Sequence, residues 1–331
     1  MHHNNKNKGT IFYMCYDHQI PTGGQKEMYK HVDILNSNGF AAYAVHQDKK
    51  YRLKWFENNT KIKSLDEVGI IFDENNDFIV LPEDNYLGFI RLPGKKIIFN
   101  QGIFSSFKYF NYNLDAVKYY INNDIKYIMT VSQHNYDYFK FILPNKKIRR
   151  IYNAVDENAF EFKKITDKKK EILILPNKSK LDLKFIFHSL QIRSFQKLNI
   201  IQKFSWKFFN NLNAKDAAKA LSDALIIIFP NIFEGFTLTL LEAMLSGTIV
   251  ISFKGGPNLE FLNKNNSFLI DAYNHLEFIK RIEKTIDLFE NNCFDDLEFI
   301  TKNAFLSARQ SSLQKEKESI LSFWEEVFKE K

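Results

Sequence analysis

Two glutamates, Glu234 and Glu242, lie around the start of an expected helix in the segment FPNIFEGFTLTLLEAMLSGTIVIS. The leucines at 238, 241 and 245 recur at helical spacing, so Glu234 precedes the helix and Glu242 lies a little over one turn inside it. An ionised carboxylate accepts hydrogen bonds from paired hydroxyl groups. These two carboxylates therefore suit a polyhydroxylated ligand, with Glu234 reaching toward a sugar and Glu242 toward a ribose.

The start of the same helix can bind an anion. Its first backbone N–H groups have no acceptor inside the helix, and the helix dipole favours negative charge there, as in a diphosphate. Together with the glutamates, this arrangement favours a nucleotide sugar. The alternative is that Glu234 is an ordinary acid at a helix start and Glu242 a solvent-facing helix residue. The amides concerned belong to Gly235, Phe236, Thr237 and Leu238.

Two series of strands and helices must position these residues. In the first half, a strand in TIFYMCY, a loop in DHQIPTGG and a helix are followed by strands in AAYAVH, DFIVLP, KKIIFNQG and IKYIMTVS. In the second half, strands are expected in EILILP, LNIIQKF, LIIIFP and TIVISF, with helices in LDLKFIFHSLQ and AKDAAKALSDA, and the segment 297–331 is helical by pattern. The charged stretch 145–170 between the series indicates a domain junction. Two parallel-sheet α/β domains are therefore expected.

Composition limits the class of protein. The 331 residues are 45% hydrophobic and 26% charged, which is typical of folded domains, and the formal charge of +7 admits anionic partners without selecting one. Two distant cysteines, Cys15 and Cys293, favour a reducing compartment. No apolar run approaches the roughly 20 residues of a membrane span, and the N-terminus is polar. A cytoplasmic protein is expected.

The glutamate segment resembles the C-terminal signature of retaining GT-B glycosyltransferases of the family-four type, in which a Glu, seven residues and a second Glu stand in this context. The resemblance implies two Rossmann-like domains facing each other across a cleft. Residues 1–160 would form the acceptor-side domain and residues 161–305 the nucleotide-sugar-binding domain. Residues 306–331 would form a C-terminal helix that packs back toward the N-terminal domain.

Other segments carry the same resemblance. PTGGQKEMYKHVDILNSNGF resembles the family's Gly-Gly loop and first helix, which implies that Gly23 and Gly24 let the backbone approach the donor phosphate or the acceptor; a plain tight turn is the alternative. The residues Asn153, Asp156 and Phe160 match positions before the interdomain linker. FKGGPNLEFL resembles the stretch after the signature strand, where Gly255, Gly256 and Glu260 would close the donor pocket.

The sequence departs from the family pattern at two places. Asn177 stands where an Arg that binds the diphosphate is expected, which leaves Lys178, or less favourably Lys180 or Lys184, as the cation. Gln101 stands where many relatives have a His near the reacting carbon. Gln101 can position a hydroxyl group but cannot act as a base.

The resemblance implies an enzyme that transfers a sugar from a nucleotide-sugar donor to a glycan or lipid-linked acceptor. Catalysis would rest on stabilising the departing diphosphate and holding an acceptor hydroxyl nearby. Retention is implied by the family alone. Neither a metal nor a cofactor is expected, because no Asp-x-Asp motif is present. By analogy, the reaction would belong to bacterial surface polysaccharide synthesis.

Three alternatives stay open. A nucleotide-sugar epimerase shares the architecture but needs acid and base residues at the sugar, and no cluster beyond the glutamates supplies them. A non-enzymatic nucleic-acid-binding protein is suggested by NKKIRR and KKITDKKK, but no recognition motif accompanies these runs, so no nucleic-acid partner is expected. DKKYRLKWF (48–56) suggests peripheral contact with an anionic membrane at the inner face, or a packed surface loop.

Overall fold

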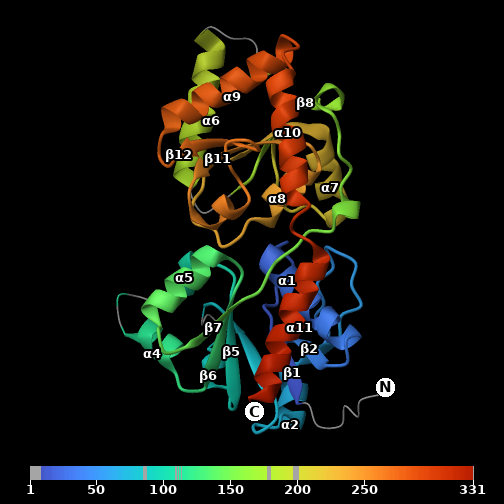
Figure 1. The fold of residues 1–331 in the computed structure, drawn as a ribbon, viewed down its shortest axis with the longest axis vertical. Coiled ribbons are helices and arrows are strands. Elements are labelled where there is room, and N and C mark those ends of the chain that lie inside the picture. Colours follow the sequence, from blue (N-terminus) through green and yellow to red (C-terminus); the bar gives the residue numbers. More distant parts are fainter. Residues whose placement is uncertain are drawn as a thin grey trace. The chain divides into compact units, whose positions relative to one another are not determined.

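The computed structural model describes residues 9–84, 88–108, 110, 112, 114–176, 180–196 and 201–330. The chain divides into two compact units (Figure 1). Unit 1 comprises Met1–Asn153 together with Leu313–Lys331, and unit 2 comprises Ala154–Ser312. The last helix of the chain therefore belongs to the unit that contains the first strand.

Unit 1 is built on a seven-stranded parallel sheet in the order β3-β2-β1-β4-β5-β6-β7. The central strands are continuous apolar runs, which is expected where helices cover both faces of a parallel sheet. The strands are β1 (Thr10–Met14), β2 (Ala41–His46), β3 (Ile62–Ser64), β4 (Phe78–Pro82), β5 (Lys95–Asn100), β6 (Ile125–Thr130) and β7 (Lys147–Arg150). The helices are α1 (Gly23–Ser37), α2 (Leu65–Ile71), α3 (Ile103–Ser106), α4 (Asp115–Ile121), α5 (Gln133–Ile142) and α11 (Leu313–Lys329).

Unit 2 is built on a five-stranded parallel sheet in the order β12-β11-β10-β8-β9. Its central strand β10 is buried at all six positions. The strands are β8 (Lys169–Ile174), β9 (Ser205–Phe208), β10 (Ala224–Phe229), β11 (Ile249–Lys254) and β12 (Phe268–Asp271). The helices are α6 (Lys180–Gln196), α7 (Ala214–Asp223), α8 (Leu238–Leu245), α9 (His275–Glu290) and α10 (Asp295–Ala308).

Both units therefore have the expected Rossmann-like α/β architecture, but the edge strands were predicted poorly. The strand expected in LNIIQKF is wrong within its described part: Ile201–Lys203 forms a 3₁₀ turn, and β9 begins at Ser205. The charged stretch taken as a junction contains β7. Each of these strands pairs with one neighbour only, β8 for β9 and β6 for β7. An edge strand exposes more of its side chains, so it lacks the apolar run that marks a central strand.

The C-terminal segment is two helices, α10 and α11, separated at residues 309–312. α11 packs against α1. The side chain of Trp324 is fully buried, and its indole Nε1 donates a hydrogen bond to the hydroxyl of Tyr13 at 3.2 Å. Ion pairs join Arg149 of β7 to Glu326 of α11 and Lys147 to Glu330 just beyond the helix. Apolar burial and these pairs hold the end of the chain on unit 1.

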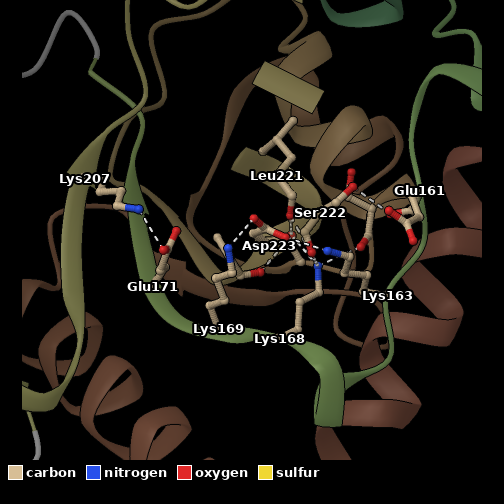
Figure 2. A network of polar contacts seen from close by, with 12 residues as sticks. Glu161, Lys163, Lys168, Lys169, Glu171, Lys207, Leu221, Ser222 and Asp223 are labelled. Atoms are coloured by element: carbon tan, nitrogen blue, oxygen red, sulfur yellow. Dashed lines mark hydrogen bonds and ion pairs between the residues drawn. The ribbon is translucent and has the colours of Figure 1, made fainter. Parts of the chain in front are cut away.

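A polar network fixes the edge of the unit 2 sheet where the strands begin (Figure 2). The Lys168 ammonium lies just before β8 and is buried. Burial, with a smaller contribution from the charge of Lys163, lowers the pKa of Lys168 to about 7. Its Nζ lies within hydrogen-bonding distance of four oxygens at the ends of α7 and α8 and just before β11: Leu221 O at 3.3 Å, Ser222 O at 2.9 Å, Ser246 O at 2.7 Å and Thr248 Oγ1 at 3.0 Å.

Asp223, at the end of α7, completes this network (Figure 2). Its two carboxylate oxygens pair with Lys163 Nζ at 2.5 Å and Lys169 Nζ at 2.7 Å. Burial alone would raise the pKa of Asp223, but the two ion pairs lower it to about 2. The C-terminal end of α8 is thus tied to the sheet, which fixes the helix whose other end carries the candidate site.

Among the helices of the described chain, none combines the length and apolar character that crossing a bilayer requires.

Candidate functional site

The loop after β10 carries Glu234 and is organised by Asn231. The Asn231 side chain is buried; its Oδ1 accepts from the backbone N–H of Phe233 at 3.0 Å. Its Nδ2 donates to Glu234 Oε1 at 3.1 Å. The glutamate is half-buried. A buried amide therefore orients the Glu234 carboxylate directly after the central strand, at the sheet edge where α/β proteins bind ligands.

The loop after β11 lies against the loop after β10. A Cβ atom on Gly255 would be 2.8 Å from Cγ2 of Ile232, and one on Gly256 would be 2.8 Å from the Ile232 carbonyl oxygen. Gly256 has φ +64°, a conformation that glycine adopts without strain. The close approach of the two backbones gives this glycine pair a packing role, and its predicted role in the donor pocket stays a prediction.

Asn258 joins the two loops. Its side chain is buried, and its Oδ1 accepts from the backbone N–H of Thr237 at 3.0 Å. α8 begins at Leu238, with Thr237 as its N-cap. One of the four amides expected to bind an anion is therefore already used within the protein. Sequence reasoning missed Asn231 and Asn258, although each follows a proline directly after a strand or a Gly-Gly turn.

Glu242 is the fifth residue of α8. Its neighbours in the chain, Leu241 and Ala243, are buried in the unit 2 core, whereas Glu242 is half-buried. This exposure is compatible with a ligand-binding carboxylate at the site edge and also with a helix residue at the protein surface. Its assignment to the ribose stays a prediction.

The expected cation lies outside the described residues, because Asn177 and Lys178 both fall in the segment 177–179. The two alternative lysines are on α6: Lys180 is its first residue, and Lys184 follows one turn later. Both are exposed. Which lysine binds the diphosphate stays a prediction.

The unit 1 residues form a second group. Gly23 and Gly24 are the first two residues of α1, and Gln101 follows β5 directly. Gln101 Nε2 donates to the backbone oxygen of Gly24 at 3.1 Å, and a Cβ atom on Gly24 would be 3.1 Å from the same nitrogen. The structure therefore brings two of the predicted residues together, at the end of the unit 1 sheet where strands finish.

The residues matched before the linker have structural roles. Asn153 is buried. The Asp156 carboxylate accepts from the backbone N–H of Asn158 at 3.0 Å and caps a short 3₁₀ helix. Phe160 packs against the unit 2 core.

Glu260, at the end of the turn after Gly256, is exposed.

The loop 48–56 is held inward by several of its side chains. Leu53 is buried, and the Tyr51 ring lies 4.6 Å from the ring of His46. The Arg52 guanidinium donates to Asn58 Oδ1 at 2.6 Å and to Thr60 O at 2.9 Å. These contacts hold the loop on unit 1, while its lysines at 49, 50 and 54 are exposed, so the membrane contact stays a prediction.

The chain thus contains two parallel α/β units, with loops of defined geometry after the central strands. Residues 192–292 match the family described as "Glycosyl transferases group 1". Among curated proteins, none matches the sequence.

Three solved structures illustrate the similarity of fold. TarM of S. aureus is 12% identical, with a TM-score of 0.73 over 98% of this chain and 99% of that chain. Sucrose-phosphate synthase from Thermosynechococcus elongatus is 10% identical, with a TM-score of 0.70 over 98% and 100%. HepE of Anabaena in complex with UDP-glucose is 14% identical, with a TM-score of 0.65 over 98% and 100%.

The fold is therefore GT-B over nearly the whole chain, and the family match covers the segment that contains both glutamates. The GT-B fold expected from the sequence is confirmed, and residues 192–292 match a glycosyltransferase family.

Proposed function

We propose that the protein transfers a sugar from a nucleoside diphosphate sugar to a hydroxyl group of a glycan or lipid-linked acceptor, with retention at the sugar carbon and without a metal ion. The observation that supports it most is the loop after β10, where buried Asn231 orients Glu234 beside the start of α8. A carboxylate at this position suits the hydroxyl groups of a donor sugar, and the amides of the helix start other than that of Thr237 suit its diphosphate.

In the proposed reaction, the bond between the sugar C1 and the diphosphate oxygen breaks, and its electron pair leaves with the diphosphate. The acceptor oxygen forms the new bond to C1, and its proton passes to an oxygen of the departing phosphate. Glu234 orients the donor sugar, and Glu242 holds the ribose. Lys178 and the amides at the start of α8 stabilise the leaving group, while Gln101 positions the acceptor hydroxyl.

UDP is the first donor nucleotide to test. The structure of HepE contains UDP-glucose, and that of the pneumococcal transferase GtfA contains UDP and GlcNAc. By the same analogy, we assign the reaction to surface polysaccharide synthesis at the cytoplasmic side of the membrane. This assignment rests on the similarity of fold and on the family match.

The decisive experiment is a thermal-shift comparison of the wild type and Glu242→Ala with UDP, GDP, dTDP and CMP. A ligand that binds the folded state alone increases the free energy of unfolding by mass action, by about 2.7 kcal/mol at a free ligand concentration of 100 times Kd. The Tm rises accordingly. We expect one diphosphate to raise the Tm of the wild type and to lose most of this effect in Glu242→Ala. Glu298→Ala, at an exposed position on α10, is the matched control and should keep the full shift.

If no nucleotide stabilises the folded wild type, the proposed donor site is wrong. Epimerisation of a nucleotide sugar without any acceptor would favour the epimerase alternative. Tight binding to DNA at physiological salt would instead revive the nucleic-acid alternative.

A further inference from the structure

Unit 1 contains a cavity of about 430 Å³ at the edge of its sheet where the strands begin. Four of its lining residues are the first residues of the adjacent strands β4 to β7: Phe78, Lys95, Ile125 and Lys147. Gly24 and Gln101 lie at the opposite edge, where strands end. The strands run parallel, so the cavity is separated from these residues by the length of the sheet and belongs to a different site.

Four lysine ammonium groups line the cavity, together with one carboxylate, that of Glu330. Within the described part of the chain, only Lys147 among the four has a carboxylate partner, and that partner is Glu330. The other three donate to backbone oxygens: Lys95 to Asn75 at 2.7 Å, Lys126 to Asn123 at 3.0 Å, and Lys146 to Asn122 at 2.7 Å and Ile125 at 3.0 Å.

These lysines keep donors and charge for a ligand. Each ammonium group has three N–H donors, so the single backbone contacts of Lys95 and Lys126 leave two donors each, and the two contacts of Lys146 leave one. Asp124, another nearby carboxylate, is paired with Lys96 at 3.2 Å. Burial lowers the pKa of Lys146, and the charge of Lys126 lowers it further. Positive charge is therefore concentrated in a concave surface, which attracts anions more strongly than a flat one does.

We propose that this cavity binds a phosphate-bearing ligand with at least two negative charges. Ammonium groups bind phosphate oxygens as point charges, and four of them around one hollow match a ligand with several anionic oxygens. The volume lies within the roughly 300–1,000 Å³ of small-molecule pockets. The ligand is a second one, distinct from the sugar donor.

The test is isothermal titration of the full chain with tripolyphosphate. The cavity variant, Lys126→Gln combined with Lys147→Gln, removes two exposed lysines from the lining. The matched control, Lys61→Gln combined with Lys140→Gln, removes two exposed lysines from elsewhere on unit 1. We expect the cavity variant to bind at least tenfold more weakly and the control to stay within twofold of the wild type.

A second arm identifies the source of the phosphate. Sedimentation with phosphatidic acid vesicles is compared for the same three proteins. If the cavity variant loses binding of tripolyphosphate but still sediments with the vesicles like the wild type, the ligand is a soluble phosphate. If the cavity variant loses sedimentation with the vesicles but still binds tripolyphosphate, the ligand is a lipid headgroup. If the cavity variant matches the wild type in both arms, or if the control loses as much binding as the cavity variant, the proposal is overturned. The cavity variant should keep the Tm shift that the donor nucleotide gives the wild type, so loss of tripolyphosphate binding in this variant does not depend on the donor site.

Discussion

At the scale of single residues, the loops of the candidate site depend on contacts that only small or amide side chains allow. The glutamate pair and the glycine pair were proposed from their spacing along the chain, and their contact with a ligand stays a prediction. Asn231 and Asn258 could not be proposed in this way, because each acts on a backbone or side-chain group whose position depends on the fold. Sequence spacing can therefore suggest groups that contact a ligand, whereas the groups that orient them become visible in the fold alone.

Gly256 provides a test of this packing. An alanine there would have to adopt φ +64° and place its Cβ 2.8 Å from the Ile232 oxygen. The left-handed conformation alone costs about 1–2 kcal/mol for a residue with a Cβ atom, and the contact adds to this. We expect Gly256→Ala to lower the free energy of unfolding by about 2–3 kcal/mol, measured by urea denaturation.

Gly69→Ala is the control for this substitution. Gly69 lies in α2, and a Cβ atom there would meet nothing within 4 Å. Because alanine favours the helix, this variant should be more stable than the wild type by about 0.5–1 kcal/mol. If Gly256→Ala costs no more than the roughly 1–2 kcal/mol of the left-handed conformation, the contact with Ile232 carries no weight.

At the scale of elements, buried strands were predicted well and edge strands poorly. β1, β4 and β10 are continuous apolar runs because helices cover both faces of their sheets. β7 is the charged segment KIRR, and its arginine at 149 is paired with α11, a helix more than 150 residues away in sequence. The local sequence pattern is the same for an arginine that pairs with a distant carboxylate and for an arginine that is exposed to solvent. The pattern therefore could not indicate that this segment is a strand.

The contact between α1 and α11 also predicts a pH dependence. Glu316 of α11 is fully buried beside Lys30, whose Nζ lies 2.9 Å from both Glu316 and Glu27. Burial raises the pKa of Glu316 above its ordinary value of 4.5, and the charge of Glu27 raises it further, against the opposing effect of Lys30. The folded state therefore binds the carboxyl proton of Glu316 more tightly than the unfolded state does. The resulting contribution to the free energy of unfolding is present below pH 4.5 and is lost as pH rises through the raised pKa.

We therefore expect the Tm of the wild type to fall relative to that of Glu316→Gln as pH rises above 4.5, because the neutral amide has no proton to lose. Glu325→Gln, at an exposed position on the same helix, removes the same charge and serves as control. Thermal unfolding of the three proteins between pH 4.5 and 9 measures the difference. Parallel pH profiles for the wild type and Glu316→Gln would contradict the assigned pKa shift.

At the scale of the whole molecule, one unit is made of two segments that are far apart in the sequence. Unit 2 is one continuous segment, whereas unit 1 needs its first 153 residues and the last helix. The apolar face of α11 contributes Ile320, Phe323, Trp324 and Val327 to the buried surface. Helical periodicity predicted that a helix ends the chain, and the family resemblance implied that this helix packs toward the N-terminal domain. Its contacts in unit 1 are with residues such as Tyr13 and Phe78.

This arrangement predicts that a chain ending at Ser312 keeps unit 2 folded and loses the cooperative unfolding of unit 1. Truncating a single buried aromatic residue costs about 3–5 kcal/mol, and a whole domain is stable by only about 5–15 kcal/mol. Loss of all of α11 should therefore unfold unit 1. The fragment Ala154–Ser312 should unfold cooperatively by itself, as followed by the fluorescence of Trp206, the tryptophan of unit 2.

The matched control joins residues 1–153 to residues 313–331 through a flexible linker, which restores α11 to unit 1 without unit 2. We expect this protein to show a cooperative thermal transition that residues 1–153 alone lack, with Trp324 fluorescence typical of a buried indole. If residues 1–153 alone unfold cooperatively at the same temperature, α11 contributes nothing to the stability of unit 1. The ion pairs of α11 with β7 would then be surface contacts of the small value usual for exposed pairs.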